Sequence, residues 1–294
     1  AKAIQGEIIS ADSMQVYRGM DIGTAKITKE QMDGVPHHLI DIMDPSDSFH
    51  VMAFQQKCKE AMEDIYARHK IPILVGGTGF YIQSVLYDIS FTETDTDIEY
   101  RQELQKIAEE QGGYVLHARL AKIDPEAADE IHPNNVKRVI RALEFNHQTG
   151  EKISIHNEQE RQRKSPYQFR YYVLSLPREI LYDRINRRVD VMRRDGLVDE
   201  VKGLLQQGIT PNMVSMQGLG YKEIIDALQG SCSFEEAFER IKRETRHFAK
   251  RQFTWFRRER DVTWIDKETY ENEDAILQYM IEDLKNAHIL PADQ

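Results

Sequence analysis

Cysteines and long apolar runs are both scarce in this chain. The two cysteines, Cys58 and Cys232, lie far apart and neither belongs to a C-x-x-C pair, which disfavours a disulfide framework and a zinc site. No apolar run reaches the roughly 18 residues that a membrane helix needs, and the N-terminus lacks the basic and then apolar pattern of a signal peptide. These absences predict a soluble protein of the reducing cytoplasm that makes no membrane contact.

Positive charge is in deficit overall but concentrated in one segment. The net charge is −10, which taken alone disfavours binding to nucleic acid. Between residues 240 and 260, however, nine basic residues are opposed only by Glu244 and Glu259, a local net charge of +7. The nine are Arg240, Lys242, Arg243, Arg246, Lys250, Arg251, Arg257, Arg258 and Arg260. An acidic protein can hold a polyanion on such a segment, although a solvated helix face has the same composition.

Predicted strands alternate with predicted helices along most of the chain. Apolar, β-rich runs bounded by turn residues occur at 7–11, 38–43, 71–75, 171–176 and 262–265. Helical patterns occur at 51–69, 79–87, 179–194, 198–207, 235–257 and 274–286. This alternation predicts an α/β fold in which a parallel sheet is flanked by helices on both faces. We assign this core to residues 1–93 and 165–294.

Residues 94–164 have almost no strand propensity and predict an all-helical insertion. Helices are expected at 98–111, 114–121 and 134–148, whereas 152–165 is polar and expected to be a loop. At the other end, residues 1–6 resemble the end of a helix closed by Gly6. A parallel sheet needs an earlier strand to feed such a helix, so we expect a strand and a loop upstream of Ala1.

Two polar positions follow predicted strands. Asp12 comes after the first strand and Thr78 follows the glycine turn after the strand at 71–75. Ligands of open α/β sheets bind at the carboxyl ends of strands, and helix N-termini beside glycines can bind anions. The alternative is that Asp12 or Ser13 only caps the next turn, and that Thr78 only caps the helix after the glycine turn.

A pair of arginines lies on the predicted helix 179–194. Arg184 and Arg188 are spaced i, i+4, which places both guanidinium groups on one helix face where they could clamp a diphosphate. The alternative is a surface helix with scattered cations, because Arg187, Arg193 and Arg194 crowd the same helix.

Three segments mix polar or basic groups with apolar or aromatic ones, as surfaces that bind unstacked bases and phosphates do. The first contains Lys137, Arg138, Val139, Ile140 and Arg141. The second contains Gln217, Gly218, Leu219, Gly220, Tyr221 and Lys222. The third contains Lys250, Arg251, Gln252, Phe253, Thr254, Trp255, Phe256 and Arg257. None of them alone specifies a reaction.

Five motifs together resemble the tRNA dimethylallyltransferase (tRNA isopentenyltransferase) family. They are D-S-M-Q-V-Y-R-G-M-D-I-G-T-A-K from Asp12, L-V-G-G-T-G-F-Y from Leu74, H-P-N-N-V-K-R-V-I-R-A-L-E from His132, G-L-G-Y-K-E from Gly218 and K-R-Q-F-T-W-F-R from Lys250. They occur in family order and span nearly the whole chain. The absence of the C-terminal zinc finger found in eukaryotic members favours a bacterial type.

This resemblance implies a P-loop-kinase-like core and a helical insertion that grips the anticodon stem-loop of tRNA. The family transfers the dimethylallyl group of dimethylallyl diphosphate to N6 of the adenosine just 3′ of the anticodon, with Mg²⁺. Carried over, Asp12 would be the general base, and Ser13, Met14 and Gln15 would line the adenine pocket. Thr78 would help to hold the reacting groups. Arg184 and Arg188 would face the diphosphate, and Arg184 would also take part in catalysis. The three mixed segments would contact tRNA.

The sequence departs from the family in one respect. The family has a phosphate loop of the form G-x-x-x-x-G-K-S/T, and these 294 residues contain none. We therefore expect the main diphosphate and magnesium ligands to lie upstream of Ala1, and name no metal ligand here. Alternatives are an isopentenyltransferase for free adenine nucleotides, a small-molecule P-loop kinase, and a tRNA-binding protein without activity. The insertion and the +7 segment favour the tRNA enzyme, which we expect to act as a monomer.

Overall fold

The computed structural model describes residues 1–91 and 97–291, which form two compact units. The first unit contains Ala1–Leu86 and Tyr167–Gln294, and the second contains Tyr87–Pro166. The boundary expected between residues 93 and 94 lies outside the described residues. The other, expected between 164 and 165, is observed between Pro166 and Tyr167.

The first unit contains a parallel sheet of three strands, in the order β2-β1-β3. These strands are β1 (Gly6–Ser10), β2 (His37–His38) and β3 (Ile71–Val75), and Ile8 pairs with Ile73 in the register of β1 and β3. The strand expected at 38–43 is therefore wrong beyond His38. Leu39 and Asp41 have φ values of 62° and 56°, which turn the backbone out of the extended conformation.

A second parallel sheet pairs β4 (Tyr171–Ser175) with β5 (Val262–Asp266). Among the described residues, no strand of the first sheet is hydrogen-bonded to this pair. The parallel pairing that we expected is therefore present, but it is divided between two small sheets instead of one continuous sheet.

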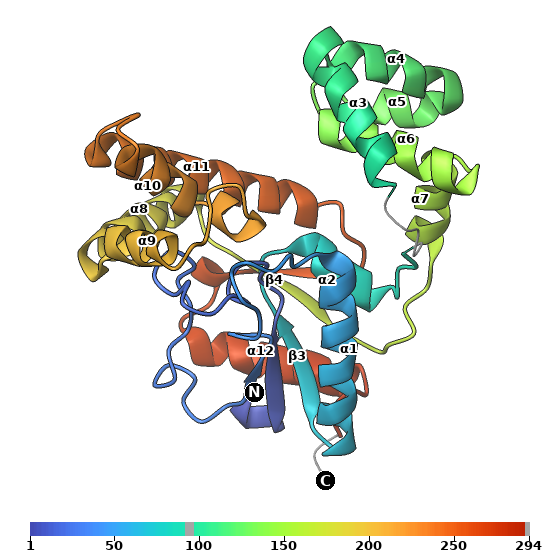
Figure 1. Cartoon of the computed structure of the whole chain (residues 1–294). Coiled ribbons are helices and arrows are strands. Elements are labelled where there is room, and N and C mark those ends of the chain that lie inside the picture. Colours follow the sequence, from blue (N-terminus) through green and yellow to red (C-terminus); the bar gives the residue numbers. More distant parts are fainter. Residues whose placement is uncertain (92–96, 292–294) are drawn as a thin grey trace. The chain divides into compact units, whose positions relative to one another are not determined.

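Helices and short 3₁₀ turns make up the rest of the first unit. The helices are α1 (Val51–Ala67), α2 (Gly79–Leu86), α8 (Arg178–Asp195), α9 (Leu197–Gln206), α10 (Tyr221–Leu228), α11 (Phe234–Phe256) and α12 (Glu273–Asn286). The turns are η1 (Lys2–Ile4), η2 (Val214–Gln217) and η3 (Lys267–Thr269). Figure 1 shows α1 along β3, and α8 to α11 gathered together. None of the helices in the described ranges is both long and apolar enough to cross a membrane.

The first few residues differ from the expectation for them. Gly6 is the first residue of β1 and not a helix cap, because the short turn before it ends at Gln5, whose φ is 52°. Sequence analysis also did not identify α10, which begins at the glycine-rich segment around Gly218.

The second unit is entirely helical where the structure describes it. Its helices are α3 (Ile98–Gln111), α4 (Gly113–Ile123), α5 (Pro125–Glu130), α6 (Val136–Thr149) and α7 (Ile153–Gln162). They enclose a core of their own that includes Leu104, Leu116, Leu120 and Leu143. Fully burying one such leucine is worth roughly 1.5–3 kcal/mol.

Helix α7 shows that the loop expected at 152–165 is wrong. The buried Asp124 accepts hydrogen bonds from the backbone N–H of Ser154 (2.9 Å) and from its hydroxyl (2.7 Å), which holds the first turn of α7 in place. Ile153 also packs against the core of the unit. A contact from elsewhere in the unit thus stabilises a helix whose own composition is polar.

Candidate active site at the carboxyl ends of β1 and β3

Asp12 lies just beyond the carboxyl end of β1 and is half-buried. Its Oδ1 accepts hydrogen bonds from the backbone N–H groups of Met14 (2.7 Å) and Gln15 (3.2 Å). Its Oδ2 has no hydrogen bond to any residue that the structure describes. The two interpretations of Asp12 therefore coexist, because one oxygen holds a local turn and the other is available to a ligand.

The glycine turn after β3 lies against the residue that precedes Asp12. Ala11 donates its N–H to Val75 (2.8 Å), and its carbonyl accepts a hydrogen bond from the N–H of Thr78 (3.3 Å). A side chain at Gly76 would overlap the backbone of Ala11, so only glycine permits this approach. The carbonyl of Thr78 accepts from Tyr81 (2.9 Å) in the first turn of α2. The fold thus brings Thr78 close to Asp12.

The last turns of α11 pack onto the same glycine turn. Gln252 Nε2 donates to the carbonyl of Gly77 (2.9 Å), and the indole of Trp255 occupies the space where Gly79 would carry a side chain. Phe80 meets Trp255 edge to face, with ring centroids 6.1 Å apart. The motifs that begin at Leu74 and Lys250 are distant in sequence but pack against each other in the fold.

The segment that follows Asp12 is held by Lys26 and Gln15. Lys26 is almost fully buried, and its Nζ lies 2.6 Å from each of three oxygens: the carbonyl of Tyr17, Asp21 Oδ1 and Asp41 Oδ1. Gln15 Nε2 donates to the carbonyls of Thr24 (3.3 Å) and Ala25 (3.4 Å). Sequence analysis included Lys26 in a family motif without assigning it a role, and this network supplies a structural one.

Glu200, on α9, is a residue that sequence analysis missed. Its carboxylate accepts hydrogen bonds from the backbone of residues 21–23 and from the hydroxyl of Tyr221 (2.7 Å). Met14 packs over Gly218 nearby. The segments 12–26 and 217–222 are thus neighbours, joined through α9. No local pattern around Glu200 could have identified it, because its partners are distant in sequence.

The arginines of α8 divide into two kinds. Arg187 pairs with Asp183 (2.8 Å) and Arg193 with Glu235 (2.7 Å). Arg184 and Arg188 are exposed and form no ion pair with the described residues. No hydrogen bond or ion pair of the described chain joins either of them to Asp12 or Thr78. They are available to an anion on the surface of α8, which packs against α9 and α11.

The +7 segment also divides into two parts along α11 and the residues that follow it. In the first half, Arg240 pairs with Asp226 (3.1 Å), Lys242 with Asp190 (2.8 Å) and Arg243 with Glu244 (3.2 Å). Four exposed cations of the second half have no acidic partner among the described residues: Lys250, Arg251, Arg257 and Arg258. The positive charge available to a polyanion is therefore concentrated in the second half.

Several residues of the three mixed segments are buried. Val139 and Ile140 lie in the core of the helical unit, and Tyr221 and Phe256 lie in the core of the first unit. Their side chains pack against protein in this structure, and the expectation that these four residues contact tRNA stays a prediction. The exposed members are Lys137, Arg138, Arg141, Gln217, Lys222, Lys250, Arg251, Thr254 and Arg257.

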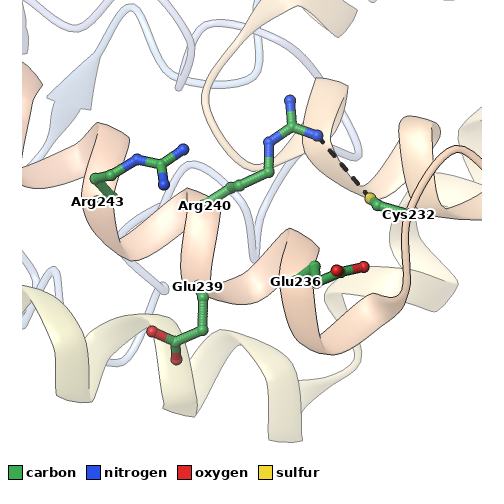
Figure 2. Close-up of a pocket in the computed structure, with 5 residues that line it drawn as sticks. All are labelled: Cys232, Glu236, Glu239, Arg240 and Arg243. Atoms are coloured by element: carbon green, nitrogen blue, oxygen red, sulfur yellow. Dashed lines mark hydrogen bonds between the residues drawn. The ribbon is translucent and has the colours of Figure 1, made fainter.

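A hollow of about 350 Å³ lies on the first half of α11 (Figure 2). It is lined by Cys232, Glu236, Glu239, Arg240 and Arg243. Arg240 Nη1 lies 3.9 Å from Cys232 Sγ. The side chain of Glu239 points away from Cys232 (Figure 2). Twelve residues of helix separate Arg240 from Gln252, a distance of about 18 Å along the axis. The hollow is therefore distinct from the candidate site around Asp12.

The described residues contain no group of three or more His, Cys, Asp or Glu side chains that could hold a metal ion. They therefore do not form a complete protein cage for Mg²⁺. Mg²⁺ is commonly bound through one or two carboxylates together with the phosphates of a substrate.

Comparisons with known proteins agree with this arrangement of motifs. The family model described as IPP transferase matches residues 15–259. The chain belongs to this family. It is 56% identical to a tRNA dimethylallyltransferase of Lachnoclostridium phytofermentans over 290 residues, which cover 99% of this chain and 93% of the relative. It is 50% identical to one of Bacillus cereus over 280 residues, 95% of this chain and 88% of the relative. The resemblance to the tRNA dimethylallyltransferases is thereby confirmed.

Solved structures give the same result. A tRNA isopentenylpyrophosphate transferase from Bacillus halodurans is similar with a TM-score of 0.71 and 47% identity, over 98% of this chain and 91% of that one. A eukaryotic dimethylallyltransferase acting on tRNA is similar with a TM-score of 0.78 and 30% identity, over 100% of this chain and 76% of that one. The mixed helix and sheet architecture is therefore shared with enzymes of this family.

Proposed function

We propose that this chain transfers the dimethylallyl group of dimethylallyl diphosphate to N6 of the adenosine 3′-adjacent to the anticodon of tRNA. The observation that supports this most strongly is the convergence of Asp12, Thr78, Gln252 and Trp255 at the carboxyl ends of β1 and β3. Relatives that share half or more of its residues bear the name tRNA dimethylallyltransferase. The reaction is an alkyl transfer to RNA in the cytoplasm, and a single chain carries it out.

Asp12 is the general base of this proposal. The exocyclic amine of adenine is a weak nucleophile because its lone pair is delocalised into the ring. As the new C–N bond forms, N6 loses a proton, and a carboxylate that accepts it contributes roughly 10²–10⁴-fold to the rate. Asp12 suits this role because its Oδ2 has no partner among the described residues, while two backbone amides hold Oδ1. Ser13, Met14 and Gln15 line the adenine pocket, and Thr78 helps to hold the reacting groups.

Arg184 and Arg188 bind the diphosphate, which leaves the allylic carbon as the C–N bond forms. Cations aimed at the developing negative charge stabilise this step, and such electrostatic stabilisation is often the largest catalytic contribution. Neither arginine forms an ion pair with the described residues, which supports the assignment, because a guanidinium already neutralised by a carboxylate binds an anion less strongly. The carboxylate of Glu273 interacts with Arg184 only at longer range.

Mg²⁺ accompanies the diphosphate in this proposal. When bound, it neutralises part of the charge of the departing group. Because the described residues offer no complete set of ligands, we assign no protein ligand to it and no step to it.

The tRNA is held by the exposed members of the three mixed segments. On the first unit, Lys250, Arg251 and Arg257, which have no acidic partner among the described residues, contact phosphates. On the helical unit, Lys137, Arg138 and Arg141 are exposed along α6 and contact the anticodon stem. Such contacts release counterions, so the affinity for RNA falls as salt rises.

Transfer of radiolabelled dimethylallyl diphosphate to an anticodon stem-loop tests the proposal. The stem-loop contains adenosine 3′ of the anticodon, and a matched one contains guanosine there. We expect label on the first RNA and none on the second or on AMP or ATP. Label on free nucleotide and not on RNA would replace the proposal with a nucleotide-modifying enzyme. RNA binding without any transfer would leave a binding protein.

A further inference from the structure

Residues 11–36, which connect β1 to β2, contain no helix or strand and only one isolated bridge, at Tyr17. Long connections without secondary structure need tertiary contacts to hold one conformation, and they are often functional. This connection contains Asp12 and the residues assigned to the adenine pocket. The contacts that hold it therefore determine where the proposed base lies.

Glu200 makes three hydrogen bonds to this connection from α9. Its Oε2 accepts hydrogen bonds from the N–H groups of Asp21 (2.8 Å) and Ile22 (2.7 Å). Its Oε1 accepts from the N–H of Gly23 (3.1 Å) and from the hydroxyl of Tyr221 (2.7 Å). Three successive backbone N–H groups form a concave anion site, and here a carboxylate of the same chain fills it.

A carboxylate that accepts at both oxygens satisfies all four partners, because three of them are backbone N–H groups and the Tyr221 hydroxyl donates here. Burial, and then the negative charge of Glu200, raise the pKa of the Tyr221 hydroxyl, which therefore keeps its proton and remains a donor. Hydrogen bonds to a charged acceptor are about twice as strong as those between neutral groups. A glutamine amide in place of this carboxylate would direct its NH₂ group at groups that donate, and would lose some of the four hydrogen bonds.

A short series of hydrogen bonds links this anion site to Asp12. Residues 21–23, which Glu200 holds, lead directly to Thr24 and Ala25, whose carbonyls accept from the side chain of Gln15. The backbone N–H of Gln15 donates in turn to Asp12 Oδ1. This series connects residues 21–23 to the carboxylate of Asp12, while residues 41–43 hold Gln15 and Val16 from the other side.

We infer that Glu200 is a positioning residue for the proposed transfer: through the amides of residues 21–23 and the side chain of Gln15, it sets the place of Asp12. Glu200 does not touch the substrate. The inference rests on the proposed function. Glu200 also lies on the helix that follows α8 directly at Gly196, so the consecutive helices α8 and α9 contain both the diphosphate arginines and this contact.

Glu200→Gln tests the inference, with Asp199→Asn as the matched control. Asp199 precedes Glu200 in α9, its side chain is 84% exposed, and it forms an ion pair with Lys202 at 3.6 Å. Asp199→Asn therefore removes the same charge as Glu200→Gln but breaks none of the four hydrogen bonds of Glu200. We expect Glu200→Gln to lower the single-turnover rate at saturating substrates by about 10–100-fold, because small displacements of a reacting group cost this much. The number of sites for dimethylallyl diphosphate, and their Kd, stay unchanged. Asp199→Asn keeps the wild-type rate.

Tyr221→Phe gives a graded test, because it removes one donor of the four. Its rate should lie between those of wild type and Glu200→Gln. Trypsin provides a readout that is independent of catalysis. Cleavage after the exposed Arg18 and Lys29 should be faster in Glu200→Gln and unchanged in Asp199→Asn.

The outcomes separate this inference from the proposed function. A wild-type rate for Glu200→Gln overturns the inference, and so does a loss of rate matched by an equal loss of diphosphate sites, which indicates general unfolding. If the wild-type chain transfers nothing to RNA, the proposed function fails. The trypsin digestion then decides alone: unchanged cleavage of Glu200→Gln overturns the positioning role.

Discussion

The two ends of β1 each have a carboxylate, and the two are held in opposite ways. At the amino end, the buried Glu7 is surrounded by the cations Arg68 and Lys70 (2.7 Å) and by the ring of His38 (2.8 Å). Just beyond the carboxyl end, Asp12 is half-buried, and among the described residues its hydrogen bonds come from two backbone amides to one of its oxygens. A carboxylate whose oxygens are both held by cations, as in Glu7, has a structural role. Partial support by neutral donors leaves an oxygen available for proton transfer. The comparison predicts that Glu7 matters for folding and Asp12 for turnover.

The largest effect is expected for Asp12→Asn. The amide keeps an oxygen that can accept from Met14 and Gln15, but it cannot accept a proton, so the transfer rate should fall by about 10²–10⁴-fold. Asp266→Asn is the control, because Asp266 also lies at the end of a strand and accepts a backbone N–H (Glu268, 3.1 Å). Single-turnover assays and tRNA binding measure the two variants. An Asp12→Asn enzyme that binds tRNA normally and turns over at the wild-type rate would end the assignment of the base.

Glu7→Gln should reduce stability and leave the transfer rate of the folded enzyme unchanged. Removing the charge leaves Arg68, Lys70 and His38 without their shared partner, and we expect a loss of about 2 kcal/mol, lower than for fully buried pairs because the cations are partly exposed. Asp64→Asn is the control, because Asp64 pairs with the same Arg68 (2.6 Å) from the surface. Denaturant unfolding should show a much smaller loss for it.

The effect of Glu7→Gln should also depend on pH. The hydrogen bonds from Arg68 lower the pKa of Glu7 well below its usual value of 4.5. A lowered pKa contributes stability above the unfolded pKa and loses it as pH falls. The difference between wild type and Glu7→Gln should therefore be constant near neutrality and shrink below about pH 4.5. A difference as large at pH 3 as at pH 7 would contradict the ionic account.

The same contrast between paired and unpaired charge applies to the cations of α11. Arg251→Gln should weaken RNA binding by about 1 kcal/mol and lower the salt dependence by about one counterion, while Arg243→Gln, which removes a cation already paired with Glu244, should change neither much. Binding titrations at several salt concentrations measure both. Equal losses for the two variants would show that pairing in the structure does not predict RNA contact.

The smallest effect is expected for Glu259, a carboxylate that is near Arg260 but whose burial outweighs the charge of that cation. Its Oε2 has no hydrogen-bond partner in the described chain, and burial raises its pKa to about 7. A raised pKa contributes stability at low pH that is lost as pH rises toward 7. Stability should therefore fall by about 1 kcal/mol between pH 5 and 8, after discounting for partial exposure. Glu259→Gln should remove this slope in thermal unfolding. An unchanged slope would assign it to other groups.

The sequence was sufficient for elements whose stability is local. The strand at 71–75 and the helix at 98–111 were predicted to the residue, because a β-rich apolar run and a capped helical pattern each encode their own conformation. The helix at 153–162 was missed because its first turn depends on Asp124. The strand at 38–43 was overextended because a hydrophobic pattern does not report the positive φ of Leu39 and Asp41.

The candidate site shows the same division. The sequence alone determined the family, the strand-end position of Asp12 and Thr78, and the concentration of cations at residues 240–260, because these depend on residue type and order. Only the tertiary structure decided that Gln252 and Trp255 pack on the glycine turn and that Glu200 holds residues 21–23. It also decided which cations remain unpaired. Hydrogen bonds and ion pairs between residues far apart in sequence depend on geometry in three dimensions, and no local pattern encodes that geometry.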